Sequence, residues 1–154
     1  MFDYILSKPL TEESFSIIKN RLKKIYDHII KNAKYYDEHD EEKVKKLFVS
    51  LDKKVKTINY DEYYIPEDID EIKNLFISKE INEDKVRERL NDIIGTFSYA
   101  VSSFIDDAME SWYFYKKDCY DPELDYKDKN FSELLQSEHA VTDLIDILFG
   151  FEGE

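Results

Sequence analysis

Residues 82–112 read NEDKVRERLNDIIGTFSYAVSSFIDDAMESW, and their apolar residues recur at alternating steps of three and four. This spacing places those residues on one face of an α-helix, because a helical turn takes about 3.6 residues. The residues on that face are Val86, Leu90, Ile93, Phe97, Val101, Phe104, Ala108 and Trp112. Asn82 stands before them and is a favourable N-cap. The stretch therefore predicts one long amphipathic helix, the longest in the chain.

Gly95 lies inside this predicted helix. A glycine in a helix interior costs about 1 kcal/mol relative to alanine. Gly95 could therefore mark a kink or a close crossing with another helix, or it could be a glycine that the helix simply tolerates.

The same spacing predicts further helices on both sides of this stretch. They are expected over residues 12–35, over residues 41–56, over a short segment that begins at Pro66, and from Asn130 to Gly150. Thr11 and Asp40 are suited to cap the first two of these helices. Residues 57–65 have no helical stripe, and we expect them to form a loop or a short extended piece.

Only three glycines and three prolines occur among the 154 residues, which leaves few residues for the turns of a β fold. We therefore predict an all-α fold, a single-domain antiparallel helical bundle of four main helices plus a short helix over residues 1–154. No uncharged apolar run approaches the ~18 residues of a membrane span. Met1–Leu10 also lacks the pattern of a signal peptide, so we expect a cytoplasmic protein.

The chain is strongly acidic, and its charge is unevenly placed. It has 22 Lys and Arg against 35 Asp and Glu, a net charge of −13. Residues 1–56 hold 13 basic and 10 acidic residues, a balance of +3, whereas residues 57–154 hold 9 and 25, a balance of −16. Phosphate repels a net anion, so we expect no direct binding of nucleic acid.

Two acidic stretches, Thr57–Ile72 and Asp106–Asp128, are also rich in aromatic residues. Carboxylates pair with arginine, and tyrosine rings supply contact area and stack on cations. This combination predicts a surface that binds a basic protein. The predicted partner-binding residues are Tyr60, Asp61, Glu62, Tyr63, Tyr64, Asp106, Asp107, Glu110, Tyr113, Tyr115, Asp118, Tyr120, Asp121 and Asp125.

The sequence offers few residues suited to catalysis. Its three glycines form no phosphate-binding loop, and no histidine has a glutamate three residues before it, as a di-metal helical bundle would need. Cys119 lies beside Asp118, and a neighbouring anion disfavours the reactive thiolate. We predict no enzyme, no cofactor and no metal. The alternative is a Mg²⁺-dependent all-α hydrolase with Asp107 and Glu110, three residues apart, as ligands.

A small, very acidic, tyrosine-rich helical chain with one cysteine resembles the bacterial immunity proteins. These neutralise the toxin domains of bacteriocins and of contact-dependent growth inhibition systems. The resemblance is one of type over the whole chain, carried by Thr57–Ile72 and Asp106–Asp128. It implies a cytoplasmic protein that covers the active site, or an adjacent surface, of a cognate toxin, which we expect to be a nuclease. A phage-type DNA mimic that inhibits a host nuclease or restriction system is the alternative binding protein, and an acidic regulatory or scaffold protein stays open.

Overall fold

The computed structural model describes residues 2–36, 40–51, 62–118 and 129–149, and for residues 111–118, 129–134 and 149 it describes the backbone only. This part of the chain is mostly helical, as predicted. Its elements are α1 (Phe2–Leu6), α2 (Glu12–Lys31), a 3₁₀ turn (Ala33–Tyr35), α3 (Glu41–Leu47), β1 (Phe48–Val49), β2 (Tyr63–Tyr64), α4 (Asp68–Ile77), α5 (Glu83–Asp118) and α6 (Lys129–Phe149). Helix α1, strand β1 and the strand pairing were not predicted, whereas β2 lies in the segment expected to be a loop or a short extended piece.

The longest helix, α5, confirms the prediction from residues 82–112. The Asn82 side chain accepts a hydrogen bond of 2.8 Å from the backbone N–H of Lys85, which caps the first turn. Seven residues of the predicted stripe have described side chains, and all seven are buried: Val86, Leu90, Ile93, Phe97, Val101, Phe104 and Ala108. This stripe packs against α2, α4, α6 and β2, so α5 is the central helix of the described part.

Helix α2 begins where the sequence predicts and ends earlier. Thr11 and Ser14 form a capping box, in which each side chain bonds the backbone N–H of the other residue. The helix stops at Lys31, four residues before the predicted end, and the 3₁₀ turn follows. The hydroxyl of Tyr36 then donates a 2.7 Å hydrogen bond to the carbonyl of Ala100 on α5, which ties this end of α2 to the central helix.

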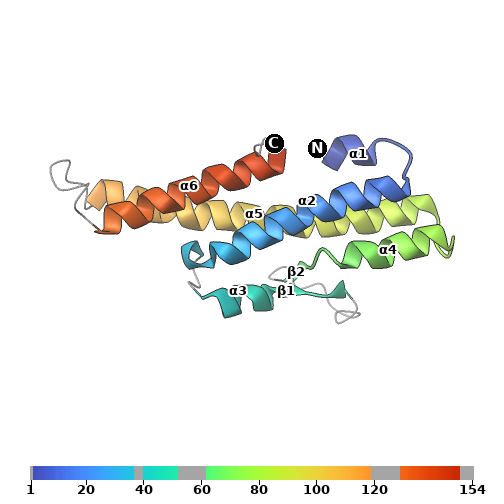
Figure 1. The fold of residues 1–154 in the computed structure, drawn as a ribbon, viewed down its shortest axis with the longest axis horizontal. Coiled ribbons are helices and arrows are strands. Elements are labelled where there is room, and N and C mark those ends of the chain that lie inside the picture. Colours follow the sequence, from blue (N-terminus) through green and yellow to red (C-terminus); the bar gives the residue numbers. More distant parts are fainter. Residues whose placement is uncertain (1, 37–39, 52–61, 119–128, 150–154) are drawn as a thin grey trace.

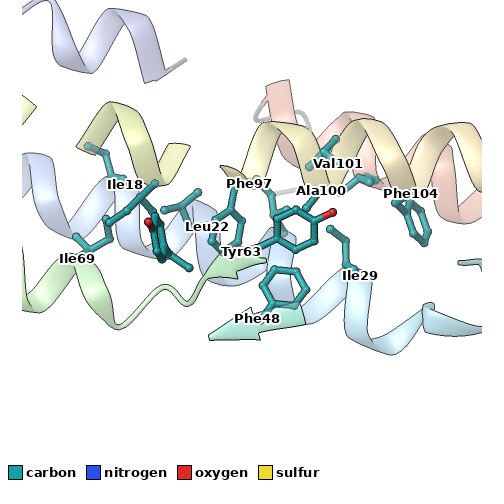
Figure 2. Packing of buried hydrophobic residues seen from close by; sticks show 14 of the residues in the cluster. Ile18, Leu22, Ile29, Phe48, Tyr63, Ile69, Phe97, Ala100, Val101 and Phe104 are labelled. Atoms are coloured by element: carbon teal, nitrogen blue, oxygen red, sulfur yellow. The ribbon is translucent and has the colours of Figure 1, made fainter. Parts of the chain in front are cut away.

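The predicted helix over residues 41–56 is wrong at residues 48–51. The chain leaves helix α3 there and becomes extended as β1, which pairs in parallel with β2 and places Phe48 opposite Tyr63. Packing explains the change, because the Phe48 ring contacts the rings of Tyr26, Tyr63 and Phe97 at centroid distances of 4.8 to 5.7 Å. Figure 2 shows Phe48, Tyr63 and Phe97 together between the strands and α5. Residues 52–56 of the predicted helix lie outside the described residues.

Four helices lie along the long axis of the molecule. In Figure 1, α2 and α5 run in one direction, and α4 and α6 run in the other. Helix α4 contacts both α2 and α5, and α6 contacts the same two helices. The described buried residues form one hydrophobic cluster between these helices and the strand pair. Among the described residues, no helix is both long and apolar enough to span a membrane.

Candidate protein-binding site

The middle of α5 has an exposed face centred on Tyr99. Tyr99 does not belong to the buried stripe of α5, and 53% of its surface is exposed. The stripe residues on the opposite side of the helix, such as Phe97 and Val101, are buried. Its ring lies 6.1 Å from the ring of the buried Tyr63, measured between centroids. The Tyr99 ring therefore has an aromatic neighbour in the core, while about half of the Tyr99 surface is exposed to solvent.

Helix geometry determines which residues surround Tyr99, because residues three, four and seven apart share a face. All four neighbours at three and four positions are small, and the residues seven positions away on each side are aspartates. We call the following set the Tyr99 face: Asp92, Gly95, Thr96, Tyr99, Ser102, Ser103, Asp106 and Glu110. Asp92, Asp106 and Glu110 are exposed.

The Tyr99 face is acidic without compensating bases. From residue 90 to residue 115 the chain contains four carboxylates and no lysine or arginine. Asp92, Asp106 and Glu110 make no ion pair with any residue that the structure describes. Because no cation neutralises these three carboxylates, the face carries a local negative potential that attracts positively charged molecules.

Six carboxylates elsewhere in the described part do have cationic partners. The ion pairs are Lys19–Asp70, Lys23–Asp27, Lys45–Glu41, Lys45–Glu42, Lys85–Glu88 and Arg87–Glu83. The Glu83 carboxylate also accepts a 2.8 Å hydrogen bond from the backbone N–H of Leu10, and Arg87 donates to the carbonyls of Leu6 and Lys8. These contacts attach the segment that follows α1 to the start of α5, so acidic residues here stabilise the fold.

Two tyrosines predicted to bind a partner lie in the core instead. Tyr63 is 4% exposed and Tyr64 is 7% exposed, because β2 pairs with β1 and packs against α5. Burial raises the pKa of the Tyr64 hydroxyl, and the neighbouring carboxylates of Asp92 and Asp68 raise it further. The two rings therefore belong to the core next to α5 and do not form an exposed surface.

The first predicted acidic stretch also contains structural carboxylates. Asp68 is only 3% exposed, and its carboxylate accepts hydrogen bonds from the hydroxyl of Ser50 and from the backbone N–H of Leu51. It therefore joins the first turn of α4 to the residues that follow β1. Asp70 on the same helix pairs with Lys19 of α2.

The remaining predicted residues divide into four groups. Asp106 and Glu110 are exposed on the Tyr99 face, whereas Glu62 and Asp107 are half-buried. Only the backbone is described for Tyr113, Tyr115 and Asp118 on the last turns of α5. Outside the described residues lie Tyr60, Asp61, Tyr120, Asp121 and Asp125.

Sequence reasoning missed Tyr99 and Asp92, which the structure places on the same face as Asp106. Both lie outside the acidic stretches, so a search for local composition does not select them. The available signal was the position of Tyr99 off the apolar stripe of α5, since a large aromatic ring on the polar side of a helix is exposed unless another element covers it.

The described residues contain no group of three or more His, Cys, Asp or Glu side chains that could hold a metal ion. Asp107 and Glu110, the alternative Mg²⁺ ligands, are thus not joined by a third such side chain within the described part.

His28 makes a contact between two helices. Its Nε2 atom lies 2.7 Å from the carbonyl of Ala140, to which it donates a hydrogen bond between α2 and α6.

Comparisons of the sequence with protein-family models and with curated proteins, and of the fold with solved structures, give no match. Function is therefore inferred from the residues and their arrangement.

Proposed function

We propose that this protein binds and neutralises a basic protein partner through the Tyr99 face, in the manner of bacterial toxin immunity proteins. The observation that carries the proposal is a helix face with three carboxylates that have no described cationic partner, arranged around an exposed tyrosine. A cognate nuclease toxin is a suitable partner, because proteins that bind nucleic acid carry basic surfaces.

The negative charge of this face determines how it would act on a partner. A base-free acidic surface steers a cationic protein toward it and raises the association rate, and this effect weakens as salt screens the charges. Tyrosine and arginine are both enriched among the residues that dominate binding energy, so Tyr99 would slow dissociation once the partner is bound. In this proposal an antiparallel bundle, with α2, α4, α5 and α6 as its main helices, presents the face.

A DNA mimic shares the acidity but would favour carboxylates at even intervals, like phosphates along a backbone. On the Tyr99 face the exposed carboxylates are unevenly spaced, 14 residues apart from Asp92 to Asp106 and 4 from Asp106 to Glu110, with Tyr99 between the first two. This arrangement favours a local protein contact over an extended imitation of DNA.

The test of this proposal is growth rescue. The gene next to the one that encodes this chain is examined for a toxin domain, which is then expressed in bacteria with and without this protein. We expect the wild-type protein to restore growth. The variant D92K/D106K/E110K should fail to do so, because it reverses the charge of the Tyr99 face.

A matched control distinguishes the effect of the position of the reversed charges from the effect of the change in net charge. The variant E42K/E80K/E138K reverses three exposed carboxylates that lie outside α5, and both triple variants move the net charge from −13 to −7. The control should restore growth as the wild type does. Rescue by D92K/D106K/E110K to the same extent as by the control would exclude the Tyr99 face as the inhibitory surface.

A further inference from the structure

Gly95 on the Tyr99 face has no packing role within the described chain. A Cβ atom added at this position would meet no atom within 4 Å, so no other described element approaches α5 closely there. Glycine in a helix interior is nevertheless unfavourable by about 1 kcal/mol relative to alanine. The space above Gly95 is therefore open, and a molecule outside this chain could approach the helix closely there.

The surroundings of Tyr99 leave space for such a molecule. Gly95 and Thr96 precede the ring by one turn, and Ser102 and Ser103 follow it by one turn, so no long side chain at these four positions of α5 screens it. The Tyr63 ring lies beside it, with the two ring centroids 6.1 Å apart. About half of the Tyr99 surface is exposed, so the ring is accessible to a partner.

Carboxylates stand at matching distances on both sides of this ring. Asp92 and Asp106 are each seven residues from Tyr99, which is about 10.5 Å along the axis at 1.5 Å per residue. A second α-helix has the same rise, so side chains at positions i, i+7 and i+14 of a helix laid along α5 would meet all three residues. Helices pack with axes about 8–10 Å apart, and small residues at the contact allow the shorter distances.

We propose that the Tyr99 face docks an α-helix of the partner that carries arginines at positions i, i+7 and i+14. The central arginine stacks on Tyr99, and the outer two pair with Asp92 and Asp106. Arginine fits better than lysine, because its planar guanidinium both stacks on an aromatic ring and pairs with a carboxylate through two hydrogen bonds. This inference rests on the proposed function, since it names the part of the basic partner that the face contacts.

A synthetic peptide tests this geometry without the natural partner. The probe is an alanine-based helical peptide of about 21 residues, long enough for a stable helix, with arginines at i, i+7 and i+14 and a fluorescent label. An isomer of the same composition has its arginines at i, i+5 and i+10, which places them on different sides of the helix. Fluorescence anisotropy at low ionic strength should show that the full-length protein binds the first peptide at least about tenfold more tightly than the isomer.

The variant G95Q tests whether the partner approaches closely. Glutamine is a good helix former and has open space at this position, so the variant should fold at least as stably as the wild type and yet bind the first peptide about tenfold more weakly. The control S16Q adds the same side chain at an exposed position of α2 and should leave binding unchanged.

Equal affinity for the two peptides, or wild-type binding by G95Q, would overturn the helix-docking proposal. Neither result would change the outcome of the growth-rescue test with the wild type and with D92K/D106K/E110K. The proposed function is therefore tested independently of the helix-docking proposal. Conversely, failure of growth rescue together with selective peptide binding would reject the toxin partner and keep the docking geometry.

Discussion

At the scale of single residues, side chains of the same type differ in burial and in hydrogen bonding. Tyr63 and Tyr99 are both tyrosines of the polar, acidic half of the chain, but one is in the core and the other is exposed. Asp68 and Asp106 differ in the same way, because the first is enclosed by hydrogen-bond donors and the second has none among the described residues. Position in the fold therefore decides which residues are free to bind a partner.

Gly95 allows the clearest prediction for one residue. Because a methyl group there meets open space, G95A should raise the free energy of unfolding by up to about 1 kcal/mol through better helix propensity. Urea denaturation followed by circular dichroism measures the change. A loss of stability would show that α5 needs glycine at this position for its own backbone geometry.

Asp68 gives the opposite prediction. The substitution D68A would leave the N–H of Leu51 and the hydroxyl of Ser50 without their described acceptor, so the free energy of unfolding should fall by about 1–3 kcal/mol. D70A is a matched control on the same helix, since Asp70 makes a more exposed ion pair with Lys19 and its loss should cost no more than about 1 kcal/mol. Similar losses for both variants would contradict a special role for Asp68.

At the scale of secondary-structure elements, polar contacts fix how α6 sits against α2. His28 donates to the carbonyl of Ala140, and Arg21 donates to the carbonyl of Ile147 at 2.8 Å. The two donors are seven residues apart on α2, and the two acceptors are seven residues apart on α6. These contacts therefore recur after two turns of each helix and set the register between them.

This arrangement makes the stability of the protein depend on pH near neutrality. Burial lowers the pKa of His28 below its ordinary value of 6.5, and this outweighs the hydrogen bond to Ala140 and the nearby charge of Asp143, which both act in the opposite direction. The unfolded state then binds more protons than the folded state. The stability that neutral His28 contributes is complete above about pH 6.5 and is lost as the pH falls below that value.

The variant H28Q isolates this contribution. Its carboxamide can still donate to Ala140 but does not titrate, so the free energy of unfolding should fall less steeply between about pH 7 and pH 5 than in the wild type. Chemical denaturation at several pH values measures both slopes. H139Q removes an exposed histidine of α6 and serves as the control for losing one histidine. Identical slopes for H28Q and the wild type would show that His28 titrates alike in the folded and unfolded chain.

At the scale of the whole molecule, much of the fold could be predicted because its helices are amphipathic. The stripe from Val86 to Ala108 identifies α5, and the Thr11 cap identifies the start of α2. The strand pair could not be predicted, because Phe48 also fits a helical stripe and leaves it only through contacts with Tyr26, Tyr63 and Phe97. Long-range packing of this kind overrides local periodicity.

The candidate site could be predicted only in part, for a related reason. Local composition identifies Asp106 and Glu110, which the structure places on an exposed face. It also selects Tyr63 and Tyr64, whose burial depends on a strand formed with distant residues. Tyr99 and Asp92 are recognised as members of the Tyr99 face only when residues three, four and seven positions apart are grouped on one side of α5. The net charge of −13 suggests a cationic partner, and the structure places three exposed carboxylates without a described cationic partner on one side of α5.

The rate at which this protein associates with a basic toxin domain identified by the growth-rescue test measures the proposed binding role of the Tyr99 face most directly. Stopped-flow fluorescence at low and high salt should show fast association by the wild type that slows as salt screens the charges. At low salt, D92K/D106K/E110K should associate at least about tenfold more slowly than E42K/E80K/E138K, although the two variants have equal net charge. Equal rates for the two variants would contradict a binding role for the Tyr99 face.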